Sequence, residues 1–356
     1  MDIFSEFIKR NQRALAKLIT LIENFERRGF EILTALENHY KNSPRLNGAG
    51  AGTGAAAAQS VIGITGPPGS GKSSIVDRLA RKITGSGNKK TVGIAAFDPS
   101  SPFTGGAILG DRVRMSNFTS PDLFFRSMGT RGCLGGMSKA ISYVLRIYEL
   151  YGFDYIIVET VGVGQLEIDV VKMTDTTIIT EVPGLGDEIQ AIKAGLFEIG
   201  DIFVINKNDR PGVDKIFCEI NYMLGLRREK QAAACAGAGA GEGENKDHWQ
   251  IPIIKTNCIS GEGIDELLDK INAHRDRLYK DDKISQNRKA RLREQYMSFA
   301  RDFIEDNLIG ELTCDAEFNE LVKTGELNLF ESLAKPGFKK IMLKMAALLT
   351  DRIESL

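Results

Sequence analysis

The segment GPPGSGKS at residues 66–73 constrains this chain most, because it predicts a phosphate-binding loop. An apolar run precedes it and the helical pattern SIVDRL follows it, so the loop would join a buried strand to a helix. Its glycines would let backbone N–H groups approach an anion, the lysine would reach the β- and γ-phosphates, and the next serine would ligate Mg²⁺. The alternative is a chance glycine-rich turn. The predicted phosphate-binding residues are Gly66, Gly69, Ser70, Gly71, Lys72, Ser73 and Ser74.

Composition narrows the class of protein. A chain of 356 residues suggests one large domain of about 200 residues with helical additions. The balance of 46 basic and 47 acidic residues favours neither nucleic acid nor a membrane surface as a partner. Five scattered cysteines without a CxxC pair fit a reducing compartment and are expected to be small core residues. With no leader pattern and no membrane-spanning run, we expect a cytoplasmic protein.

Low-complexity tracts suggest how the chain is organised. Residues 1–46 form a predicted N-terminal extension of two helices, and the glycine- and alanine-rich residues 47–59 form a flexible linker. Residues 60–283 would be the nucleotide-binding domain, in which the alanine- and glycine-rich tract 232–244 is a surface-loop insertion. Residues 284–356 are charged and amphipathic, which predicts a helical C-terminal region with a partner or dimer surface.

Seven short apolar runs predict the strands of the central domain. Most show no alternation, as expected of strands covered on both faces. Helical patterns at 136–150, 186–197 and 263–271 separate several of them, which predicts an α/β fold with a mostly parallel sheet flanked by helices. Ligand-binding loops would then gather at the carboxyl ends of the strands. The runs lie at 61–65, 92–97, 123–125, 155–158, 177–182, 202–205 and 251–254.

The segment NKND at residues 206–209 selects the nucleotide base. The Asp209 carboxylate can accept from N1–H and the 2-amino group of guanine, and adenine has neither donor. Asn206 and Lys207 would brace the loop and cover the base. The segment TNCISGEG at 256–263, which includes Ser260, would offer backbone N–H groups to the guanine O6, or is an ordinary strand-to-helix turn.

The segment DYIIVETVGVGQ at 154–165 predicts a buried strand that ends in an acid, followed by a glycine-containing loop that senses the γ-phosphate. Glu159 would act near Mg²⁺, directly or through water, and the backbone N–H of Gly162 would meet the γ-phosphate. Asp98 and Asp111 are further candidates for positioning Mg²⁺ or the attacking water. A helix N-cap and a solvated surface charge are the alternatives for these two acids.

No residue stands out as a general base. The three histidines, His39, His248 and His274, lie outside the motifs and are expected to be structural or solvated. Phosphoryl transfer needs mainly positioning and charge compensation, so slow basal hydrolysis that a partner accelerates is expected. Basic residues in or beside predicted loops could supply charge or could simply be solvated, namely Arg112, Arg114, Arg131 and Lys193.

Together these segments, with RALAKLITLIEN, FDPSSPFTGGAILGDRVRM, SMGTRGCLGG and VPGLGDEIQAIKAG, resemble the MeaB/ArgK family of SIMIBI-class P-loop GTPases over residues 10–275. The resemblance implies a GTPase that binds GTP, GDP and Mg²⁺ and acts as a chaperone for adenosylcobalamin-dependent acyl-CoA mutases, chiefly methylmalonyl-CoA mutase. It would gate cofactor loading and protect the mutase. Adenosyltransferase is a further possible partner, and the C-terminal helices match a dimerisation extension.

By this resemblance Lys72, Asp98, Glu159 and Lys193 are the catalytic set. Ser73, Asp98, Asp111 and Glu159 would hold the metal, and 184–193, with Asp187, would be an additional switch loop.

Leu166, Glu181 and the insertion depart from the family pattern and bear on the partner and the loops. A kinase acting on a transport-binding protein or small molecule would need an acceptor pocket and a base, which the sequence does not show. A metallochaperone GTPase would need histidine-rich or paired-cysteine motifs, which it lacks. Only an assay separates a nucleotide-bound scaffold from an active GTPase.

Overall fold

A computed structural model describes residues 2–24, 26–40, 59–85, 87, 90–98, 120–129, 141–160, 173–184, 197–237 and 249–304. The chain divides into two compact units, Met1–Lys289 and Ala290–Leu356. Of the second unit, the structure describes only the end of helix α11 (Lys283–Ile304). Within the described ranges, none of the helices combines the length and apolar content that crossing a bilayer requires.

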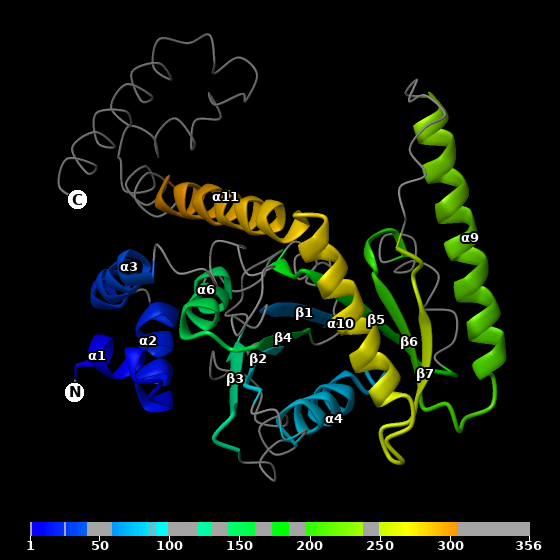
Figure 1. The fold of residues 1–356 in the computed structure, drawn as a ribbon, viewed down its shortest axis with the longest axis horizontal. Helices are drawn as coiled ribbons and strands as arrows, with labels where there is room; N and C mark the ends of the chain where they lie inside the picture. Colours follow the sequence, from blue (N-terminus) through cyan, green and yellow to red (C-terminus); the bar gives the residue numbers. More distant parts are fainter. Residues whose placement is uncertain are drawn as a thin grey trace, which may run out of the picture. The chain divides into compact units, whose positions relative to one another are not determined.

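The centre of the first unit is a parallel sheet, as the apolar runs predict (Figure 1). Its strand order is β3-β2-β4-β1-β5-β6-β7, and every neighbouring pair is parallel. The order reverses beside β1, so the loop that follows β1 opens at the topological switch point, where such sheets bind ligands. The strands are β1 (Ser60–Thr65), β2 (Val92–Asp98), β3 (Leu123–Gly129), β4 (Tyr155–Thr160), β5 (Thr176–Glu181), β6 (Ile202–Asn206) and β7 (Ile253–Thr256).

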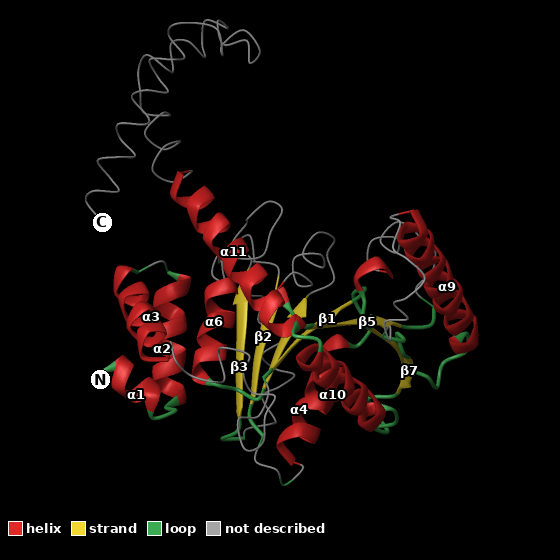
Figure 2. Cartoon of the chain, turned by 45° about the horizontal axis from the view of Figure 1, so that its top comes forward, coloured by secondary structure: helices red, strands yellow, loops and turns green. Residues whose placement is uncertain are grey.

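Helices cover both faces of this sheet (Figure 2). Successive side chains of a strand point to opposite faces, so Ile62 and Ile64 of β1 pack with helices α4 (Lys72–Gly85) and α10 (Ile264–Lys280). Val61 instead joins the core beneath α6 (Ile141–Tyr151). Helix α9 (Val213–Gly237) packs on β6 and β7. The fold is therefore the α/β P-loop architecture that the sequence predicts.

The N-terminal segment forms three helices where the sequence predicts two, namely α1 (Ile3–Ile8), α2 (Gln12–Glu23) and α3 (Arg27–Tyr40). The additional helix, α1, is short, and Asp2 caps its N-terminus, since the Asp2 carboxylate accepts from the backbone N–H groups of Phe4 and Ser5. On α2, Leu15 and Leu18 are fully buried and share a core with α6 and the sheet. The N-terminal helices thus belong to the same compact unit as the sheet.

Helix α9 corrects one expectation. The tract 232–244 was expected to be a surface loop, but α9 continues through residues 232–237, because alanine is the strongest helix former. The rest of the tract lies outside the described residues. The sequence patterns also missed the body of α9, because apolar residues occur on both of its faces. Among these is Cys218, which is exposed and not the core residue expected.

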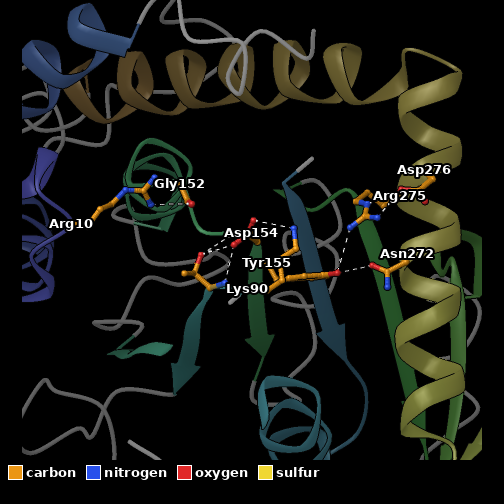
Figure 3. Close-up of polar contacts among 9 residues, drawn as sticks. Arg10, Lys90, Gly152, Asp154, Tyr155, Asn272, Arg275 and Asp276 are labelled. Atoms are coloured by element: carbon orange, nitrogen blue, oxygen red, sulfur yellow. Dashed lines mark hydrogen bonds and ion pairs between the residues drawn. The ribbon is translucent and has the colours of Figure 1, made fainter. Parts of the chain in front are cut away.

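Polar contacts close the amino edge of the sheet (Figure 3). The Asp154 carboxylate accepts from the Thr91 backbone N–H at 2.8 Å, and Lys90 Nζ lies 3.5 Å from it. The Tyr155 hydroxyl, at the start of β4, donates to Asn272 Oδ1 of α10 at 2.7 Å. These contacts fasten helices and loops to the strand starts, and the loop that contains residues 66–73 lies at the opposite, carboxyl edge.

Candidate nucleotide-binding site

The loop after β1 has a backbone that only glycine adopts readily. Gly66, Gly69 and Gly71 have φ angles of 142°, 77° and 91°. A Cβ atom at Gly66 would lie 2.1 Å from the Thr180 carbonyl oxygen, and one at Gly71 would lie 2.2 Å from Asn206 Nδ2. The loop is therefore packed against neighbouring strands and ends at the N-terminus of α4, an arrangement that suits an anion.

Lys72, the first residue of α4, places its ammonium group inside this loop. Its side chain is buried, and Nζ donates to the carbonyl oxygens of Gly66 at 2.7 Å and Pro67 at 2.9 Å. The positive charge thus lies where the motif predicts phosphates. Ser70, whose backbone N–H donates to Pro67 O at 3.2 Å, is fully buried beneath the loop.

The predicted metal ligands Ser73 and Glu159 are in contact. Ser73 Oγ donates to Glu159 Oε1 at 2.5 Å, and Glu159 is buried near the end of β4. Mg²⁺ prefers oxygen ligands and usually takes only one or two from protein, so this pair fits it. The described residues contain no cluster of three or more His, Cys, Asp or Glu suited to a metal ion. Asp98 ends β2 at the same edge, but its side chain lies outside the described part.

The loop after β6 is tied to the phosphate loop. Asn206, buried at the end of β6, donates from Nδ2 to Ser70 O at 2.8 Å. Lys207 has a φ of 57° and donates from Nζ to Gly69 O at 2.8 Å. Asp209 is exposed, and its Oδ1 accepts from Asn257 Nδ2 at 2.8 Å. The structure thus brings together the predicted phosphate-binding and base-reading residues.

The loop after β7 depends on Asn257, which the sequence analysis did not single out. Besides donating to Asp209, Asn257 accepts at Oδ1 from the backbone N–H groups of Ile259 at 2.8 Å and Ser260 at 3.3 Å. The N–H of Ser260 is therefore engaged within the turn. In the described part of the chain, nothing accepts from the Cys258 N–H, which makes it the available donor. The signal was the asparagine itself, because Asn often closes such turns with its side chain.

Arg78 of α4 holds this loop. Its Nε donates to Cys258 O at 2.6 Å and its Nη2 to Ile259 O at 2.8 Å. Burial raises the pKa of the Cys258 thiol, which donates to Asn206 Oδ1 at 3.4 Å. A pocket of about 530 Å³ lies between helix and loop, and it is lined by Ser73, Ser74, Asp77, Arg78, Arg81, Cys258 and Ile259.

Several predicted residues lie outside the described part of the chain. They are Asp111, Gly162, Lys193, Asp187, Arg112, Arg114, Arg131 and Leu166. Their roles stay predictions.

A buried histidine lies at the amino edge, away from these loops. His274 Nδ1 is 2.9 Å from Thr176 Oγ1, and Nε2 is 3.7 Å from Asp201 Oδ1. The Trp249 indole packs on His274 and donates to Asp201 O at 2.8 Å. Burial lowers the pKa of His274 to about 4 and raises that of Asp201 to about 6. This cluster is part of the core at the strand starts, as expected for a structural histidine.

Comparison with known proteins gives a consistent result. The model of the family described as "Methylmalonyl Co-A mutase-associated GTPase MeaB" matches residues 15–313. A protein of Pyrococcus horikoshii that carries a GTPase name is 40% identical over 322 residues, which cover 90% of this chain and 91% of that protein. The GTPase ArgK of Escherichia coli is 30% identical over 318 residues, with 88% and 86% covered.

One solved structure covers nearly the whole chain. It is described as a LAO/AO transport system kinase, and it matches with a TM-score of 0.58 and 22% identity over 98% of this chain and 97% of its own. At this identity the likeness shows the fold alone.

Proposed function

Because this chain belongs to the MeaB family of methylmalonyl-CoA mutase-associated GTPases, we propose that it is the GTP-hydrolysing chaperone of an adenosylcobalamin-dependent acyl-CoA mutase. The chain is a P-loop GTPase and binds guanine nucleotides. The proposed client is methylmalonyl-CoA mutase, which the family description names. Nucleotide turnover would gate the loading of its cofactor and protect the mutase.

Base recognition rests on the contact between the loops after β6 and β7. The Asp209 carboxylate, oriented by Asn257, would accept from N1–H and the 2-amino group of guanine. Each such charge-assisted bond contributes about 1.5–3 kcal/mol, and adenine can form neither. The N–H of Cys258, which has no acceptor among the described residues, would donate to the guanine O6, and the Lys207 stem would cover the ring. This joined pair of loops is the observation that carries the proposal of guanine specificity.

Phosphate binding rests on the loop after β1. We propose that the Lys72 ammonium moves from the carbonyl oxygens of Gly66 and Pro67 to the β- and γ-phosphates. Ser73 and Glu159 would hold Mg²⁺, which when bound neutralises charge on the phosphate oxygens. Asp98 would support the same side of the site from the end of β2.

The remaining predicted parts complete the proposal. Asp111 would position the metal or water, Gly162 would contact the γ-phosphate, and Lys193 would supply positive charge from the switch loop. Because phosphoryl transfer needs positioning and charge compensation, a mutase that orders these groups would raise a slow basal rate. We further propose homodimer formation through residues 284–356 and adenosyltransferase as an additional member of the complex.

The test is GTP hydrolysis with and without purified methylmalonyl-CoA mutase. ATP serves as the base control, and Lys72→Ala serves as the inactive control. Acceleration confined to GTP and to added mutase is the expected result. GTP turnover that does not change when the mutase is added would keep the assignment as a GTPase and reject methylmalonyl-CoA mutase as the client.

A further inference from the structure

Helix α9 carries apolar side chains on a face that the sheet does not cover. Its inner face packs on β6 and β7 through residues such as Ile220 and Leu224, which are buried (Figure 1). On the opposite face Tyr222 is 68% exposed, Leu226 is 37% exposed, and Cys218 is also exposed. An exposed apolar stripe on a helix whose other side is already packed indicates an interaction surface.

Five residues of this outer face, two of which are Cys218 and Tyr222 of the stripe, have the spacing of a helix–helix seam. Lys215, Cys218, Tyr222, Gly225 and Glu229 follow one another at intervals of three, four, three and four residues, as the seam positions of a two-helix coiled coil do. A Cβ atom added at Gly225 would meet nothing within 4 Å, so a second helix has room to approach there. The seam therefore has an aromatic centre, small neighbours and charged ends.

The charges make the seam complementary to itself in one direction. Lys215 and Glu229 lie equally far on either side of Tyr222, and both are exposed. Neither has an ion-pair partner among the residues that the structure describes. A second α9 running antiparallel would place its Glu229 against Lys215, twice by symmetry, and its Leu226 against Cys218. A parallel copy would oppose like charges, which disfavours it.

We propose that the outer face of α9 is a self-association surface, on which α9 of a second copy packs antiparallel with Tyr222 on the two-fold axis. Such an interface is isologous and closes as a pair. The seam of residues 215–229 spans about 21 Å of helix. One helix pair of this length is smaller than a standard stable interface, so the association is weak and forms only at high protein concentration. It is separate from the C-terminal dimer proposed above and would join such dimers.

Disulfide trapping tests the axis directly. In a Cys218→Ser chain, Tyr222→Cys places two thiols on the axis, and mild oxidation should give a disulfide-linked dimer on a non-reducing gel. Asn221→Cys in the same background is the matched control, because its neighbouring exposed position points about 100° away around the helix. Equal cross-linking of the two variants, or none with Tyr222→Cys, would overturn the proposal.

A charge exchange tests the pairing. Lys215→Glu and Glu229→Lys should each weaken the α9-dependent association step, measured by sedimentation velocity, by roughly fivefold. The double variant should restore it, because the exchanged charges again face each other. Unchanged GTP binding in all three variants would show that they fold. Failure of the double variant to recover, or a Tyr222-dependent contact with the mutase but not with a second copy, would contradict self-association.

Discussion

Replacing Arg78 by methionine should weaken guanine nucleotide binding without disturbing the phosphate loop. Arg78 donates two hydrogen bonds to the loop after β7, at 2.6 Å to Cys258 O and 2.8 Å to Ile259 O. A shielded hydrogen bond from a charged donor contributes about 1.5–3 kcal/mol. Because Arg78 is partly exposed, we take about 1 kcal/mol for each bond. Methionine keeps an unbranched stem and a high helix propensity, so the loss is confined to the guanidinium.

The expected result follows from what the loop carries. Without Arg78 the Cys258 N–H must be ordered when the base binds, which costs up to about 2 kcal/mol, or roughly 30-fold in the Kd for GDP. Inorganic pyrophosphate would contact only the phosphate loop, so its affinity should not change. Isothermal titration calorimetry measures the Kd for GDP, and competition against GDP measures the affinity for pyrophosphate.

The matched control is Arg81→Met. Arg81 lies on the same helix and lines the same pocket, but it forms an ion pair within α4, with Asp77 at 2.8 Å. This variant should leave the Kd for GDP within about twofold of the parent. If Arg78→Met weakened both ligands equally, α4 itself would be disturbed. If it weakened neither, the loop would be held without Arg78 and the reasoning would fail.

Three further predictions concern other groups. Lys72→Ala should abolish GTP turnover, because it removes the ammonium from the phosphate loop, and retained turnover in a phosphate-release assay would refute that role. Asp209→Asn should shift turnover from GTP toward xanthosine triphosphate, whose 2-position carries a carbonyl acceptor, whereas an unchanged preference would show that another group reads the base. The third prediction concerns pH. The lowered pKa of His274, about 4 in the folded chain, gives stability that is present above its unfolded value of 6.5 and is lost as pH falls toward 4. The raised pKa of Asp201, about 6, acts oppositely, because stability falls as pH rises from 3.8 through 6. Asp201→Asn keeps an acceptor for the Thr177 N–H and removes only the titration of Asp201. The wild type gains stability from Asp201 on acidification and the variant does not. The unfolding free energy of the variant relative to wild type should therefore fall by roughly 1 kcal/mol per pH unit from pH 6 to 4. A constant difference in urea denaturation across this range would exclude the assignment.

The sequence predicted features that are encoded locally. Each strand contains or overlaps a short apolar run, and residues 66–73 carry the glycines and the lysine of the phosphate loop within eight positions. Contacts between distant segments were not predictable in this way. Arg78 and Cys258 are 180 residues apart, and no local pattern shows where an arginine on a helix will point. Asn257 and Asp209 likewise meet only because β6 and β7 are neighbours.

The contacts between these loops predict which variants should change nucleotide affinity and which should change the discrimination between GTP and GDP. Asn206 joins the loop after β6 to Ser70, and Lys207 joins it to Gly69. Arg78 joins the loop after β7 to α4. These contacts lie where we propose that the base and the β-phosphate bind, and GTP and GDP share both groups. Variants that remove one of these three contacts should therefore weaken the binding of GTP and of GDP by the same factor. Residues 99–119, 161–172 and 185–196 follow the carboxyl ends of β2, β4 and β5 and hold the predicted γ-phosphate contacts. Substitutions in these three segments should change the ratio of the Kd for GTP to the Kd for GDP. If a variant of Asn206, Lys207 or Arg78 changed this ratio, the separation of the two roles would be contradicted.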